Sequence, residues 1–135
     1  MNSQTNDSIK APTKPPKPED KPFESFITEE FIPNLKGALT EKGFPPEELI
    51  FRNGERPVTG GDCWIIQGMI SNGRRFWLCF SKNKISSSKA LALAERGSEP
   101  TVLESFLVDE KRTTLALLIS RMLQRLNGQK WLGAN

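Results

Sequence analysis

Apolar residues follow two different spacings along the chain, and these spacings predict the elements. Between positions 27 and 39 they recur every three to four residues, as Ile27, Phe31, Leu35, Ala38 and Leu39. This repeat places side chains on one face of a helix. Between positions 63 and 80 the apolar residues are nearly continuous, which is typical of buried strands. We therefore expect a helix followed by a sheet.

Polar residues and prolines define the expected ends of this first helix. Thr28 is a candidate N-cap, and the two glutamates after it would lie in the first turn, where negative charge is favourable. Pro33 is tolerated only in a first turn, so the regular helix should begin close to it. Gly43, followed by two prolines, ends the helix.

The clearest local signal is a hairpin. The runs Cys63–Ile70 and Arg74–Phe80 are apolar and β-prone, and Asn72-Gly73 lies between them. Asn-Gly favours a two-residue hairpin loop, because both residues tolerate positive φ. This loop would pair Gly68 with Trp77, so that the indole lies over the bare glycine.

This register divides the hairpin into two faces. The first, expected in the core, holds Ile65, Gln67, Met69, Phe76, Leu78 and Phe80. The second holds Trp64, Ile66, Gly68, Ile70, Arg75, Trp77 and Cys79. It is too apolar to face water, so a helix, the tail or a partner should cover it. Cys63 and Cys79 would point to opposite sides of the sheet, where no disulfide can join them.

The remaining segments complete an α+β architecture. Leu49–Phe51 is a short strand candidate, residues 90–94 (ALALA) suit a fourth strand, and residues 101–108 are ambiguous. Residues 109–127 predict a long helix with one apolar face. We expect a mostly antiparallel sheet of about four strands, with an N-terminal and a long C-terminal helix packed on it. The domain would span residues 23–135, after a disordered Pro/Lys-rich tail over residues 1–22.

Composition limits the chemistry that this chain offers. The sequence has no histidine and two cysteines, so it lacks the residues for a His-containing triad, a four-cysteine cluster or a typical zinc site. Carboxylate pairs occur at Glu29/Glu30, Glu47/Glu48 and Asp109/Glu110, but all fit helix starts or turns. We expect no catalytic residues, no metal site and no cofactor.

Charge is spread unevenly along the chain. Residues 23–71 carry four Lys/Arg and eight Asp/Glu, or −4, whereas residues 72–135 carry eleven and five, or +6. This asymmetry indicates an acidic partner, with an unevenly charged, solvated surface as the plainer explanation.

The basic residues near the hairpin ends are the candidate partner-binding cluster, and they are Arg74, Arg75, Lys82, Lys84 and Lys89. They would steer an acidic protein toward the hairpin. Trp77 and Trp131 are candidate docking anchors, with a core position as the alternative for both. The mixture of basic and aromatic residues also suits a single-stranded nucleic-acid-binding module. That reading fits less well, because the first half of the chain is acidic.

Three phrases carry a resemblance to a known family. They are KPFESF at 21–26, PTVLESFLVDE at 100–110 and LNGQKWLGAN at 126–135. Across residues 21–135 the chain resembles the V subunits (NdhV) of the cyanobacterial and chloroplast photosynthetic NAD(P)H dehydrogenase-like (NDH) complex.

The resemblance implies a non-catalytic, cofactor-free peripheral subunit on the cytoplasmic face of the thylakoid membrane, attached only through the complex. It would contact the S subunit, stabilise the region that accepts electrons from ferredoxin, and support cyclic electron flow around photosystem I. Direct contact with ferredoxin is open, and no nucleic acid is expected. The basic cluster is inferred from charge alone, because the resemblance specifies no binding motif.

Overall fold

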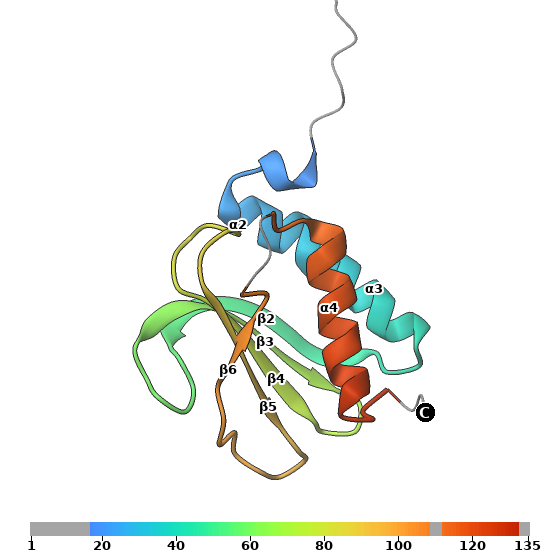
Figure 1. The fold of residues 1–135 in the computed structure, drawn as a ribbon. Helices are drawn as coiled ribbons and strands as arrows, with labels where there is room; N and C mark the ends of the chain where they lie inside the picture. Colours follow the sequence, from blue (N-terminus) through green and yellow to red (C-terminus); the bar gives the residue numbers. More distant parts are fainter. Residues whose placement is uncertain (1–16, 109–111, 133–135) are drawn as a thin grey trace, which may run out of the picture.

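A five-stranded antiparallel sheet forms the centre of the computed structural model, which describes residues 17–108 and 112–132 (Figure 1). Its strands are β2 (Pro46–Glu55), β3 (Asp62–Ile70), β4 (Arg75–Phe80), β5 (Lys89–Ala94) and β6 (Glu104–Phe106). They pair in chain order, as a meander. The N-terminal helix and α4 (Leu115–Gly128) pack side by side on one face of this sheet (Figure 1). The expected α+β fold is confirmed.

Two strands differ in extent from the sequence expectations. The strand expected at Leu49–Phe51 is the middle of the longer β2, which continues through the Asn53-Gly54 pair. The ALALA segment is β5, the fourth strand, as predicted. The ambiguous segment 101–108 contains β6, so the sheet has five strands.

The N-terminal helix begins earlier than expected. It consists of α2 (Phe23–Ser25), a wide π-helical segment η2 (Phe26–Phe31), and α3 (Ile32–Glu41), which follow one another directly. The N-cap prediction was therefore wrong: Thr28 lies inside the helix, where its hydroxyl donates to the Glu24 carbonyl. Burial of Phe26, Ile27 and Phe31 against the sheet stabilises these extra turns.

The π-helical segment shows how the helix passes Pro33 without a break. Proline lacks an N–H, and its ring collides with the carbonyl four residues earlier in an ordinary α-helix. In the wider turn, the Ile32 N–H bonds the Ile27 carbonyl, five residues back. Such π-bulges occur inside otherwise regular α-helices. The expectation that the helix starts near Pro33 was wrong, because the helix begins earlier and accommodates Pro33 by widening just before it.

The β3–β4 hairpin has a three-residue loop, so the predicted register was wrong by one residue. Gly68 pairs with Phe76 rather than with Trp77. The loop is 71–73, and Gly73 adopts a φ of 86°, as in three-residue loops that end in a left-handed residue. Because side chains alternate along a strand, this slip moves every β3 side chain to the opposite face relative to β4.

The two faces of the hairpin therefore differ from the predicted sets. The helix-facing side buries Ile66, Ile70, Phe76, Leu78 and Phe80. The other side buries Cys63, Ile65, Trp77, Cys79, Ala92 and Ala94, with Leu103 packed against them. Phe76, not Trp77, lies over Gly68, where a Cβ atom would collide with the phenyl ring.

The N- and C-terminal segments meet at the start of α4. Thr114 caps this helix, with its hydroxyl accepting from the Leu117 N–H. The Glu19 carboxylate accepts from the Leu115 N–H at 2.7 Å, which suits the positive end of the helix dipole. Glu19 belongs to η1 (Pro18–Asp20), so contacts with the domain begin before the boundary expected at residue 23. The helix predicted over residues 109–127 begins later than expected, because residues 112–114 are not helical and Thr114 has the extended backbone of an N-cap. The tail prediction for residues 1–16, and the first three residues of the predicted helix (109–111), lie outside the described residues.

Candidate functional site

The five residues of the predicted basic cluster lie at opposite ends of β4. Arg74 and Arg75 stand where β3 turns into β4, and we call this the arginine end. Lys82 and Lys84 lie in the β4–β5 connection, residues 81–88, which we call the lysine loop. Figure 1 shows this loop (yellow) near α2, and the β3–β4 turn near the far end of α4. Lys89 is the first residue of β5.

Arg74 makes an ion pair and a ring contact within the chain. Its Nε atom lies 2.8 Å from Glu95 Oε1, and its guanidinium lies 5.6 Å from the centroid of the Trp131 ring. The second Glu95 oxygen accepts from the Trp131 indole N–H at 2.8 Å. These contacts attach the C-terminal segment after α4 to the β3–β4 turn. Both hydrogen bonds lower the pKa of Glu95, that from Trp131 first and that from Arg74 second.

Arg75 also makes its contacts within the chain. Its guanidinium lies 5.0 Å from the Trp77 ring centroid and donates to the Ser98 carbonyl. One nitrogen lies 3.4 Å from a Glu99 carboxylate oxygen. Together with Leu103, these contacts cover part of the second sheet face. The sequence suggested a helix, the tail or a partner as the cover, and among the described residues the segment after β5 covers this part of the face.

The lysine loop presents its charges differently. Lys82 and Lys84 are exposed, and neither forms an ion pair with any residue in the described part of the chain. Ser87 shapes the loop: its hydroxyl donates to the Lys84 carbonyl at 2.7 Å and accepts from the Lys82 N–H at 3.3 Å. Two cations are thus held outward on an ordered loop.

Lys89 belongs to neither group, because it is buried. Its ammonium donates to the Ser87 carbonyl at 2.9 Å and lies 5.7 Å from the Phe80 ring centroid. Burial lowers the pKa of Lys89, since the charged form loses water. The predicted cluster of five therefore divides into two arginines with internal partners, one buried lysine and two exposed lysines.

The two candidate tryptophan anchors are buried in this structure. Trp131 is 1% exposed and Trp77 is 5% exposed, so a docking role for either would require its ring to leave the interior. Phe76 and Phe80 are also buried. The hairpin therefore offers no exposed aromatic side chain among the described residues on which a base could stack. The alternative of a single-stranded nucleic-acid-binding module loses its main support.

The two cysteines lie together on the second sheet face, contrary to the prediction that they point apart. Neither forms a disulfide, and both line a small pocket to which residues of β5 and β6 also contribute. The pKa of Cys79 is raised to about 12, chiefly by burial. The reversal follows from the three-residue hairpin loop, which moves Cys63 to the Cys79 side.

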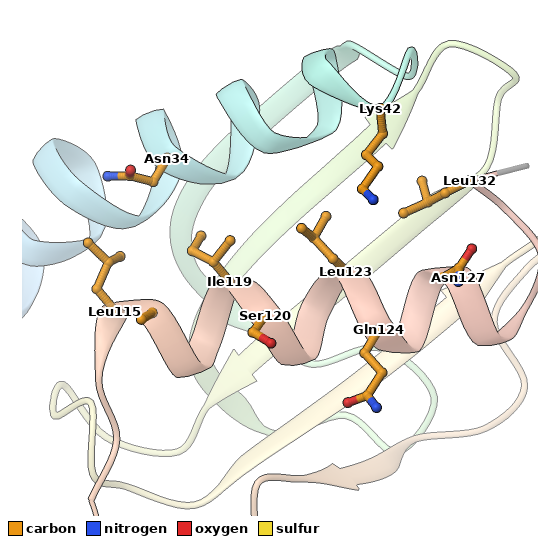
Figure 2. Close-up of a pocket in the computed structure, with 10 residues that line it drawn as sticks. Asn34, Lys42, Leu115, Ile119, Ser120, Leu123, Gln124, Asn127 and Leu132 are labelled. Atoms are coloured by element: carbon orange, nitrogen blue, oxygen red, sulfur yellow. The ribbon is translucent and has the colours of Figure 1, made fainter. Parts of the chain in front are cut away.

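Sequence reasoning missed a groove between α3 and α4, shown in Figure 2. Its volume is about 680 Å³. Its lining residues include Leu115, Ile119, Leu123 and Leu132, with Lys42 at the α3 end. The signal was present in the sequence, because the apolar stripe of α4 is wider than one packed face requires. Leu118, Met122 and Leu126 are buried, whereas Leu115, Ile119 and Leu123 remain partly exposed.

The described residues contain neither a metal-ligand cluster nor a membrane-spanning helix. Across 17–108 and 112–132, no three His, Cys, Asp or Glu side chains gather closely enough to hold a metal ion. Within the same ranges, none of the helices combines the length and hydrophobicity needed to cross a bilayer.

Comparison with known proteins gives one family. Residues 17–133 match a family described as a protein of unknown function, DUF2996. No curated protein matches the sequence. The matched region begins at the first described residue, so it includes the η1 segment that contacts α4.

Proposed function

The chain belongs to the DUF2996 family, and we propose that it is a non-catalytic docking subunit of the photosynthetic NDH complex. In this proposal it is an NdhV-type V subunit on the cytoplasmic face of the thylakoid membrane, held there through the complex. It contacts the S subunit and supports ferredoxin-dependent cyclic electron flow around photosystem I. The chain itself transfers no electrons and needs no cofactor.

One observation carries the proposal: the lysine loop presents two exposed lysines that no described carboxylate neutralises. Charges of this kind raise the association rate of an oppositely charged protein and make binding sensitive to salt. Ferredoxin is small and acidic and therefore suits the loop. The resemblance across residues 21–135 supports the choice of complex.

The arginine end contributes less to docking in this proposal. Arg74 and Arg75 each have a carboxylate partner within the chain, so much of their charge is neutralised locally. Lys89 is buried, and its ammonium donates a hydrogen bond to the Ser87 carbonyl of the lysine loop. Of the five basic candidates, Lys82 and Lys84 are the two that we propose contact ferredoxin.

Ferredoxin titration at low and moderate salt tests the proposal. Lys82→Glu with Lys84→Glu should weaken binding at low salt by at least about tenfold, because it replaces attraction with repulsion. Lys17→Glu with Lys36→Glu is the matched control, since it makes the same net charge change at other exposed positions. At about 0.1 M salt, where the screening length is about 10 Å, the loop variant should still bind more weakly than the parent, whereas the control should change affinity by no more than about threefold.

Each result has a distinct meaning. Equal losses in the two double variants would show that only net charge matters, which contradicts a docking role for the loop. If ferredoxin binds neither variant nor the parent chain, the ferredoxin contact is wrong. Co-purification of the parent chain with the NDH complex then tests the subunit assignment separately.

A further inference from the structure

The groove between α3 and α4 has the form of a helix-binding site. Leu115, Ile119 and Leu123 follow one another at intervals of four along α4, and Leu132 continues their apolar line beyond the helix end (Figure 2). Leu115 to Leu123 spans about 12 Å at 1.5 Å per residue, or about two helical turns. Amphipathic helices bind such grooves through apolar side chains spaced three or four residues apart.

The charge that lines the groove in the described chain is positive. Lys42 is the only charged residue that lines it within the described chain, and its ammonium points toward the space between Leu123 and Leu132 in Figure 2. Lys42 forms no ion pair with a described residue. The α4 sequence LALLISRMLQRLNG contains no Asp or Glu. The groove therefore combines an apolar floor with a cation that has no counter-charge among the described residues.

We propose that this groove binds an acidic amphipathic helix of a partner protein. Apolar residues of that helix lie on Leu115, Ile119 and Leu123, and one of its carboxylates pairs with Lys42. Partial desolvation at the groove edge strengthens this ion pair relative to one in open water. The inference goes beyond the proposed function, because it concerns another surface and does not require ferredoxin.

Two other occupants fit the groove less well. Residues 1–16 of this chain carry two lysines, one aspartate and three prolines, so their charge matches that of Lys42 and their prolines oppose a helix. A second copy of the chain would present the same Lys42 and the same acid-free α4 in a symmetric interface. Charge complementarity therefore selects an acidic segment of a different protein.

Photo-crosslinking in the native host identifies the occupant. A benzophenone amino acid replaces Ser120 or Gln124, which lie on the groove rim and are exposed. Thr40, an exposed α3 residue that does not line the groove, is the control position. Both rim positions should crosslink one partner segment that has helical apolar spacing and net negative charge, and Thr40 should not. No adduct, or an adduct with residues 1–16, a second copy, a lipid or a neutral segment, overturns the proposal.

A charge-swap experiment then tests the contact with Lys42. A fluorescent peptide of the crosslinked segment is titrated with the full-length chain. Lys42→Glu should weaken binding at least tenfold, and replacing the facing peptide carboxylate with lysine should restore it. Ile119→Asp should weaken binding because it places a negative charge on the apolar floor of the groove, whereas Thr40→Asp should leave affinity unchanged, with circular dichroism confirming that each variant is folded. Unchanged affinity in Lys42→Glu overturns the proposal.

The two proposals fail separately. Lys82→Glu with Lys84→Glu changes ferredoxin binding but should leave the peptide affinity within twofold, because the lysine loop does not line the groove. A groove peptide that depends on the lysine loop instead of Lys42 contradicts the groove assignment and leaves the ferredoxin result intact.

Discussion

The two ends of β4 carry similar charges and use them differently. At the arginine end, Arg74 and Arg75 pair with Glu95 and Glu99 and lie over Trp131 and Trp77. In the lysine loop, two cations face solvent without a described partner. A guanidinium binds carboxylates through several donors and stacks on rings, whereas an ammonium is more strongly hydrated. The difference indicates that the arginine end stabilises the fold and the lysine loop remains available for binding.

Among the variants that test this comparison, Trp131→Ala should cause the largest loss of folding stability. It removes a ring that is 1% exposed and the partner of both Glu95 and Arg74. Truncating a buried tryptophan costs about 3–5 kcal/mol, which urea unfolding would measure. Trp131→Phe, which retains a ring without the indole N–H, should lose less. A loss below about 1 kcal/mol in Trp131→Ala would show that the C-terminal segment is not held at the arginine end.

Glu95→Gln should have a smaller, pH-dependent effect at the same end. The folded-state pKa of Glu95 lies below its ordinary value of 4.5. Its stabilising contribution is therefore present above pH 4.5 and is lost as the pH falls through the lowered pKa. Because this carboxylate is largely exposed, we expect a difference below about 1 kcal/mol at neutral pH. Parent and variant should converge in acid, and a constant difference across pH would contradict the assignment.

The sequence predicted the fold class, because periodicity and the strand-forming runs depend on local pattern. The hairpin register was not predictable from that pattern. Both faces of β3 and β4 are apolar, so alternation does not distinguish a two-residue loop from a three-residue loop, and Asn72-Gly73 suits either. The prediction that Cys63 and Cys79 point to opposite faces was wrong for this reason alone, and the two cysteines are free, as expected.

The site was less predictable than the fold. Counting charges found Lys82 and Lys84, but it could not separate them from Arg74 and Arg75, whose partners Glu95 and Glu99 are about 20 residues away in sequence. Burial of Lys89 accompanies its contacts with the Ser87 carbonyl and the Phe80 ring, which a count of charges does not contain. The groove depends on the distance between two helices, which no local pattern contains.

Lys89→Met tests the buried lysine, which belongs neither to the arginine end nor to the exposed lysines of the lysine loop. Burial lowers the pKa of Lys89 below its ordinary value of 10.5, so the unfolded chain binds its proton more tightly than the fold does. The stability of the parent chain should therefore rise as the pH increases from the lowered pKa toward 10.5. Lys89→Met removes this penalty and should be slightly more stable than the parent at neutral pH, with the difference shrinking in alkali. Equal pH profiles would show that the ammonium is hydrated in the fold.

Lys82→Ala with Lys84→Ala should have the smallest effect on stability and thus sharpen the comparison. Exposed side chains without partners contribute little to folding, so the change should stay within about 0.5 kcal/mol, whereas Arg74→Ala should cost more. Ferredoxin affinity at low salt should fall in the lysine variant and lose most of its salt dependence. Ser87→Ala keeps the charges but removes the hydroxyl that orders the loop, so it distinguishes charge from position. If Ser87→Ala binds as the parent does, charge near this end of β4 is sufficient; if it binds weakly, the loop geometry is part of the site.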